Sequence, residues 1–291
     1  MSAELVFQQA LNGLSFGALL FILAAGLSLV FGMMDVVNLA HGAFYMLGAY
    51  VALSVVQRTG SFWLAMVVAP LALAALGLVL EPLLLRRLRG RHLDQVLLTI
   101  GVSLVVVDQI GVVWGREVRS LAAPAGLDGS VALYGGDYPL YRLFVIGFGV
   151  ALAALLSYVY SRTKIGMRIR AGVEDAEMLG ALGIDTNRLF ASTFATGAAL
   201  AGLAGVIAAP VFGVQPGMDT DPGLLYSLVV VVVGGLGTLG GAVAGSVLVG
   251  PADTFGKVVF QEFALAVIFA IVALVLLLRP TGLLGRIRIA R

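Results

Sequence analysis

Three polar side chains interrupt the long apolar stretch near the start of the sequence: Asp35, Asn38 and His41 lie within residues 31–42, FGMMDVVNLAHG. An ionisable group at membrane depth is costly, so this cluster indicates a functional site. One interpretation is structural, with Asn38 or Asp35 capping the helix that follows. Another is a translocation pathway, where a helix N-terminus inside the membrane offers partial positive charge to a carboxylate. A third, a proton relay, is less compatible with the sequence, because on one helix positions 35 and 41 would be about 240° apart.

Other reactive groups are sparse. The sequence has no cysteine and two histidines, His41 and His92, so it predicts no thiol chemistry and no clustered metal site. The nearest approach to a P-loop is GPADTFGKV at 250–258, with five residues instead of four between its glycines and no Ser or Thr after Lys257. We therefore expect no cofactor, no metal and no catalytic residue, and we do not expect an enzyme.

The elements that position these residues are long apolar segments. With 60% hydrophobic and 12% charged residues, the 291-residue chain has too little polar sequence to cover a soluble globule. Segments of about twenty apolar residues predict an all-α membrane protein formed as one polytopic domain over 1–291. The predicted spans are 6–31, 39–57, 62–83, 94–114, 140–160, 190–211 and 261–279.

Basic residues predict the orientation of the spans. They cluster at Arg86, Arg87, Arg89 and Arg91, at Arg162, Lys164, Arg168 and Arg170, and at Arg279, Arg286, Arg288 and Arg291. The positive-inside rule assigns all three clusters to the cytoplasm, with an outside loop at 115–139, the N-terminus outside and the C-terminus inside. Glu81 and Asp94 are expected to pair with arginines of the first cluster.

The second and third basic clusters both lie inside, and the spans at 190–211 and 261–279 already cross the membrane outward and back. Residues 223–255 must therefore begin and end outside. Apolar arms at 224–233 and 242–250, each too short to span alone, flank the glycine-rich segment GGLGTLGG at 234–241. We predict a re-entrant pair of half-helices, so that about eight transmembrane elements make up the fold. The turn could line the pathway through Gly234, Gly235, Gly237 and Thr238.

A polar loop at 161–188 is predicted to lie inside, with a short helix over 174–185. Glu174, Asp175, Ala176 and Gly180 resemble the start of the EAA loop, through which ABC importer permeases dock on their ATPases, and Gly183 follows as a helix stop. A solvated connector without a partner is the alternative interpretation. The position of the loop between two late spans favours a coupling loop.

Four segments resemble the LivH-type permeases of branched-chain amino acid ABC transporters: 13–52 (GLSFGALLFILAAGLSLVFGMMDVVNLAHGAFYMLGAYVA), 174–185 (EDAEMLGALGID), 197–210 (GAALAGLAGVIAAP) and 229–250 (VVVVVGGLGTLGGAVAGSVLVG). The resemblance implies an ABC importer permease fold in the bacterial inner membrane, importing branched-chain or other apolar amino acids. It also implies three kinds of partner besides membrane lipid: a second, LivM-type permease, two cytoplasmic ATPase subunits that hydrolyse ATP, and a periplasmic binding protein, with no nucleic acid. A urea or short-amide permease of the same family, and a proton-coupled secondary transporter or channel, are the alternatives.

Overall fold

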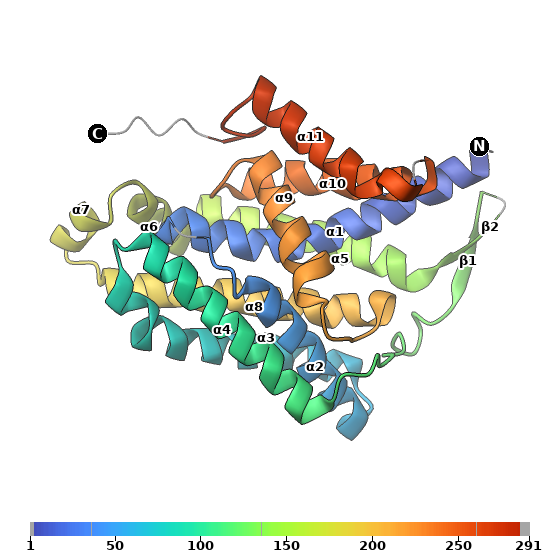
Figure 1. The fold of residues 1–291 in the computed structure, drawn as a ribbon, viewed down its shortest axis with the longest axis horizontal. Helices are drawn as coiled ribbons and strands as arrows, with labels where there is room; N and C mark the ends of the chain where they lie inside the picture. Colours follow the sequence, from blue (N-terminus) through green and yellow to red (C-terminus); the bar gives the residue numbers. More distant parts are fainter. Residues whose placement is uncertain (1–2, 36, 135, 260, 286–291) are drawn as a thin grey trace.

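The computed structural model describes residues 3–35, 37–134, 136–259 and 261–285, and in these residues the chain is mostly helical (Figure 1). Its α-helices are α1 (Ala3–Met34), α2 (His41–Thr59), α3 (Phe62–Leu83), α4 (His92–Trp114), α5 (Leu140–Arg162), α6 (Lys164–Glu174), α7 (Ala176–Ala181), α8 (Thr186–Phe212), α9 (Leu225–Gly234), α10 (Leu239–Val259) and α11 (Ala264–Leu278). Shorter helical turns are η1 (Leu85–Leu88), η2 (Asp219–Leu224) and η3 (Gln261–Phe263). The predicted all-α architecture is confirmed.

Five of the described helices, α1, α3, α4, α5 and α8, are long and apolar enough to cross a membrane, and α9 with α10 adds a sixth candidate as a bent pair. Helices also form at the predicted spans 39–57 and 261–279. There, α2 is not among the membrane-span candidates and α11 has only 15 residues. The chain is a multi-pass membrane protein.

The centre of the bundle is formed by α1 and α8, whose apolar segments are mostly buried. By contrast, α3, α4 and α5 lie at the periphery and expose large apolar side chains, such as Leu71, Leu104 and Val150. This is the pattern of a bundle whose outer faces contact lipid, since a soluble protein would bury them. Figure 1 shows α11 along one edge of the molecule, beside α10.

The connections gather at two ends (Figure 1). One end, which we call the α7 end, carries η1, α6 and α7, and Arg89 of the first basic cluster donates a hydrogen bond to Asn187 there, 2.6 Å away. The opposite end, the hairpin end, carries the start of α1 and an antiparallel pair, β1 (Ser130–Leu133) and β2 (Gly136–Pro139). Two basic clusters therefore lie at the same end, as predicted, whereas Arg286, Arg288 and Arg291 lie outside the described residues.

The bent pair confirms the predicted turn and corrects the predicted length of its second arm. Gly235 and Gly237 have φ of 112° and 74°, which an L side chain rarely adopts, and the chain bends by 114° between α9 and α10. However, α10 continues to Val259 and has 21 residues, instead of ending near 250. Pro251 does not stop it, and the helix is held along its length by packing against α1.

Candidate functional site

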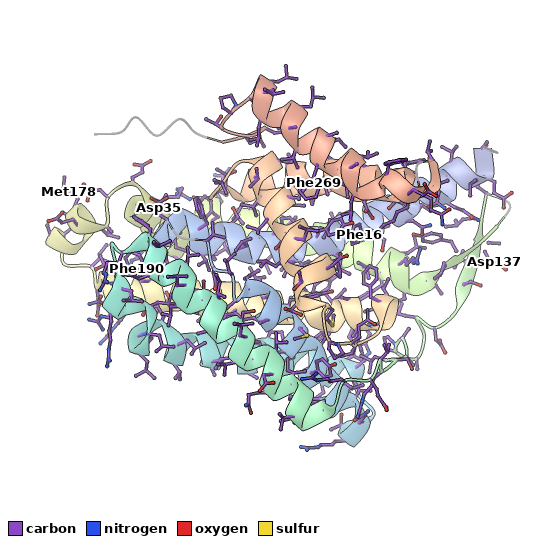
Figure 2. All side chains as sticks on the ribbon, in the orientation of Figure 1. Phe16, Asp35, Asp137, Met178, Phe190 and Phe269 are labelled. Atoms are coloured by element: carbon purple, nitrogen blue, oxygen red, sulfur yellow. The ribbon has the colours of Figure 1, made fainter. Side chains whose placement is uncertain are left out.

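Asp35 ends the first helix and does not cap the second one. It is exposed, has a φ of 55°, and its amide donates to the Phe31 carbonyl at 2.8 Å. This is the left-handed residue that often follows a helix, a conformation that Asp tolerates better than most side chains. Figure 2 shows Asp35 at the same end of the molecule as Met178. The expected cap, and a position of Asp35 inside the bundle, are therefore wrong.

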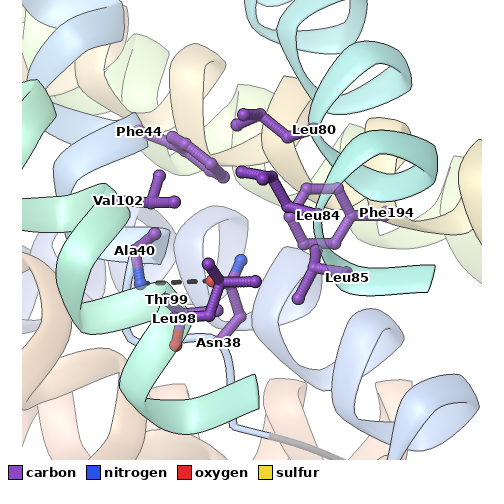
Figure 3. A pocket seen from close by; sticks show the side chains of 10 residues that line it. All are labelled: Asn38, Ala40, Phe44, Leu80, Leu84, Leu85, Leu98, Thr99, Val102 and Phe194. Carbon is purple, nitrogen blue, oxygen red and sulfur yellow. Dashed lines mark hydrogen bonds between the residues drawn. The ribbon is translucent and has the colours of Figure 1, made fainter. Parts of the chain in front are cut away.

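Asn38 is buried and organises the approach to α2. Its side-chain oxygen accepts a hydrogen bond from the Ala40 amide at 3.1 Å (Figure 3). The Leu39 amide donates to Thr99 Oγ1 at 3.2 Å. The N-cap position of α2 is Ala40, which makes no side-chain cap. Asn38 thus forms an Asx turn two residues before the N-cap position of α2. The predicted cap by Asn38 on the helix itself is wrong.

The space beside this turn is small. Asn38 and Thr99 share it with apolar side chains of α2, α3, α4 and α8, among them Phe44, Leu80 and Phe194 (Figure 3). Its volume is about 10 Å³, and a cavity needs about 10–15 Å³ to hold one water molecule. The break is closed to an amino acid in this conformation.

His41 lies deep in the bundle at the first position of α2. It is fully buried, and its Nε2 is 2.8 Å from the Leu23 carbonyl, so Nε2 carries the proton. Leu23 is eleven residues before the end of α1, or about 16 Å along the helix axis. The N-terminus of α2 therefore starts well inside the bundle. The His41 Nδ1 atom has no hydrogen-bond partner among the described residues. Neither ring nitrogen pairs there with a carboxylate, so the proposed relay gains no support.

A second break meets the start of α2 from the other direction. After α8, the chain turns into η2, and a Cβ on Gly42 would lie 1.9 Å from the Asp219 carbonyl oxygen. Tyr45, one turn into α2, has its ring beside Gly223, and its hydroxyl is buried without a hydrogen-bond partner among the described residues. Two irregular segments thus converge on one point, which is how transporters with discontinuous helices build their sites. Sequence reasoning missed Tyr45, since nothing in an apolar helix distinguishes this tyrosine.

The glycine turn between α9 and α10 packs against the second half of α1. The Thr238 carbonyl accepts from Ser28 Oγ at 3.1 Å, and a Cβ on Gly237 would lie 2.8 Å from the Gly32 Cα atom. Thr238 Oγ1 also accepts from the Gly241 amide at 3.1 Å, which caps α10. Gly234 and Gly235 are buried against Gly241 and Gly285. These glycines permit close backbone contact, and a pathway role for them stays a prediction.

The predicted coupling helix is divided between two helices. Glu174 ends α6, Asp175 caps α7 by accepting from the Met178 amide at 2.8 Å, and α7 has only six residues. The single helix predicted over 174–185 is therefore wrong, because Asp175 adopts an extended conformation. Ala176 and Gly180 belong to α7, and Gly183 follows it with a φ of 83°.

The outward face of α7 is apolar. Met178 and Leu182 are 60% and 73% exposed, whereas Leu179 is buried against Met33 and Leu189. Leu179 thus anchors α7 to the end of α1 and the start of α8, while Met178 lies at the outer edge of the molecule (Figure 2). An exposed methionine on so short a helix, with an exposed leucine directly after it, marks a contact surface.

A charged cluster at the hairpin end escaped the sequence analysis. Asp253 is buried, accepts from the Tyr226 hydroxyl at 2.7 Å, and pairs with Lys257 Nζ at 2.7 Å. The sequence does contain an indication of this pair, because opposite charges four residues apart in an apolar helix are placed to pair. The sequence analysis considers this segment only as the nearest approach to a P-loop. Among the described residues, no group of three or more His, Cys, Asp or Glu side chains could hold a metal.

Comparison with known proteins gives matches along nearly the whole chain. Residues 9–278 match the family described as branched-chain amino acid transport system, permease component. The chain is 33% identical to the high-affinity branched-chain amino acid transport permease BraD of Pseudomonas aeruginosa, over 96% of this chain and 95% of BraD. It is 30% identical to LivH of Escherichia coli over 98% of each chain, and 29% identical to LivM of Salmonella typhimurium over 92% of this chain and 68% of LivM. No solved structure matches it.

Proposed function

Because this chain belongs to the family of branched-chain amino acid transport permease components, we propose that it is the membrane permease subunit of an ABC importer for branched-chain and other apolar amino acids. The observation that carries the proposal is the relationship to BraD and LivH over nearly the full length of all three chains. The exposed apolar face of α7 supports it, since a permease without its own P-loop must receive the motion of separate ATPases through a contact surface.

The partners follow from the same proposal. A second permease related to this one, of the LivM type, completes the membrane part, and the match to LivM supports this because two related permeases can share one fold. Of the two ATPase subunits, one docks on α7 and the end of α6 of this chain, and a periplasmic protein delivers the amino acid at the hairpin end. ATP is hydrolysed by the ATPases, so the permease itself is not an enzyme.

The orientation in the bacterial inner membrane is part of the proposal. The α7 end faces the cytoplasm, because the basic residues of η1 and α6 gather there. The N-terminus and the hairpin then lie outside, and the C-terminus lies inside. A chain without cysteine suits a labelling test, with Thr59→Cys at the hairpin end and Leu182→Cys after α7. A membrane-impermeant maleimide should label Thr59→Cys in intact cells and Leu182→Cys only after permeabilisation; the reverse pattern contradicts the orientation.

The pathway is proposed to follow α1. The break at Asp35, Asn38 and His41 and the turn at Gly234, Gly235, Gly237 and Thr238 both contact the second half of this helix. A helix N-terminus inside the bundle offers amide dipoles to a passing carboxylate. Movement of α1 relative to α2 and the turn would open the space beside Asn38, which is closed here.

Reconstituted uptake tests the proposed function. The chain is purified with the second permease and the two ATPases encoded by adjacent genes, and the complex is placed in vesicles. The vesicles are supplied with the binding protein encoded beside them and with labelled leucine, isoleucine, valine or urea. We expect ATP-dependent accumulation of the three amino acids and none of urea. Accumulation driven by a proton gradient without ATP contradicts the importer and supports a secondary transporter.

A further inference from the structure

A cavity of about 260 Å³ lies at the hairpin end between α1, α5, α8 and α10. Its apolar wall includes Phe16 and Leu19 of α1 and Phe212 of α8. Phe16 packs edge-on against Phe212 and Tyr226, with ring centroids 5.9 and 5.4 Å apart. A mostly apolar cavity that contains a few polar groups is the usual form of a small-molecule site, and this one lies just below the common range of about 300–1,000 Å³.

The cavity also contains a buried carboxylate. The side chain of Asp253 is 3% exposed, and it is held by Tyr226 and by Lys257, each at 2.7 Å. The Lys257 ammonium lies 5.6 Å from the centre of the Phe16 ring and itself stays 57% exposed. An ionised carboxylate has about four lone-pair sites. The contacts with Tyr226 and Lys257 use two of these sites, which leaves Asp253 able to accept from a cationic ligand.

A second cation lines the cavity without a carboxylate of its own. Arg142, in the first turn of α5, donates to the side-chain oxygen of Asn12, a neutral amide. It forms no ion pair with the carboxylates of the described residues. The lining thus holds two cations, Arg142 and Lys257, against one carboxylate. An excess positive charge beside an apolar wall favours a ligand that has both a carboxylate and an apolar part.

We propose that this cavity binds the zwitterionic group of the transported amino acid. Arg142 binds the α-carboxylate, Asp253 binds the α-ammonium, and the apolar side chain lies against Phe16 and Phe212. The assignment rests on the proposed function and adds to it the residues that bind the two charges of the substrate. Urea and short amides carry neither charge, so they leave Arg142 and Asp253 without partners. The cavity borders the first half of α1, whereas the break before α2 and the glycine turn between α9 and α10 border its second half. One helix therefore connects the binding site with the closed space beside Asn38.

Calorimetric titration of the complete importer, without its binding protein and without ATP, tests the assignment. The ligands are leucine, leucinamide, which lacks the carboxylate, and urea. We expect leucine to bind at least tenfold more tightly than leucinamide, and urea not to bind measurably. Arg142→Gln should weaken leucine about 10- to 100-fold and leave leucinamide within about threefold. Arg142→Lys should recover part of the preference for leucine, because it restores the charge.

Arg116→Gln is the matched control, since Arg116 is an exposed arginine of the same end that does not line the cavity. It should bind leucine as the wild type does. Equal weakening of leucine and leucinamide by Arg142→Gln overturns the assignment, because a structural defect would not distinguish the two. A wild-type importer that accumulates leucine from its binding protein but binds none on its own also overturns it. Failure of uptake itself contradicts the proposed function instead.

Discussion

Gly48 of α2 tests whether the bundle depends on direct contact between helix backbones. A Cβ placed on Gly48 would lie 2.4 Å from the Cα atom of Gly202 in α8 and 2.5 Å from its carbonyl oxygen. Ordinary contact begins at 3.4 Å, so Gly48→Ala forces α2 and α8 apart by roughly 1 Å near this point. Both obstructing atoms are backbone, so no rotamer change relieves the clash. Overpacking of this kind costs about 1–3 kcal/mol.

The propensity gain of alanine must be separated from that cost. Gly→Ala inside a helix contributes about 0.8–1.0 kcal/mol of stability by itself. Gly101 in α4 and Gly147 in α5 are matched controls, because an added Cβ at either position meets no atom within 4 Å. The gain cancels between the variants. We therefore expect Gly48→Ala to be about 1–3 kcal/mol less stable than Gly101→Ala.

Thermal unfolding in detergent, followed by tryptophan fluorescence, measures the difference. At about 2–4 °C for each kcal/mol, Gly48→Ala should melt roughly 2–12 °C below Gly101→Ala and Gly147→Ala. Equal melting temperatures for the three variants would refute the reasoning. They would mean that α2 and α8 can separate at little cost, and that the close approach is not a requirement of the fold.

Three further predictions concern single contacts. Arg89→Met leaves the carboxylate of Glu81, which is 1% exposed, without its cation, so this variant should lower the free energy of unfolding by about 3–5 kcal/mol. Recovery of stability in the double variant with Glu81→Leu checks that the unpaired carboxylate is the cause. An unchanged stability of the single variant contradicts the prediction. Asn38→Ala removes the Asx turn before α2 and should cost about 1–3 kcal/mol in the same melting assay; a melting temperature equal to the wild type contradicts it. Asp175→Ala removes the cap of the six-residue α7 and should reduce co-purification of the ATPases, whereas Asp185→Ala removes the cap of the 27-residue α8 and should not; equal effects argue against docking through α7.

The long apolar helices were predictable because length and composition determine them. The span expected at 94–114 is α4 (His92–Trp114), and the span expected at 140–160 is α5 (Leu140–Arg162). Two local charge pairs were also predictable, Glu81 with Arg89 and Asp94 with Arg91. In each pair, the partners are close in sequence at the polar end of a span. The helix α6 was missed, since its basic residues had been interpreted only as an indicator of sidedness.

Contacts between distant segments could not be predicted from one sequence. His41 was recognisable as a polar residue in an apolar stretch, but not as a partner of Leu23 on the preceding helix. Likewise, Arg142 and Asn12 are 130 residues apart, and Tyr226 and Asp253 are 27 apart. Hydrophobic periodicity describes which face of a helix is buried and carries no information about which helix covers it. The residues that line the hairpin-end cavity could consequently be identified only from the structure.

The packing of α1 against α10 has a consequence for how the protein is made. Gly13 faces Pro251, Gly17 faces Ser246, and Ser28 bonds to Thr238, which is synthesised 210 residues later. At about 5–20 residues per second, the first helix waits roughly 10–40 s in the membrane for the neighbours that cover its glycines. A chain cut short before α10 never covers them, so an unfinished permease exposes a face of α1 that the complete one buries.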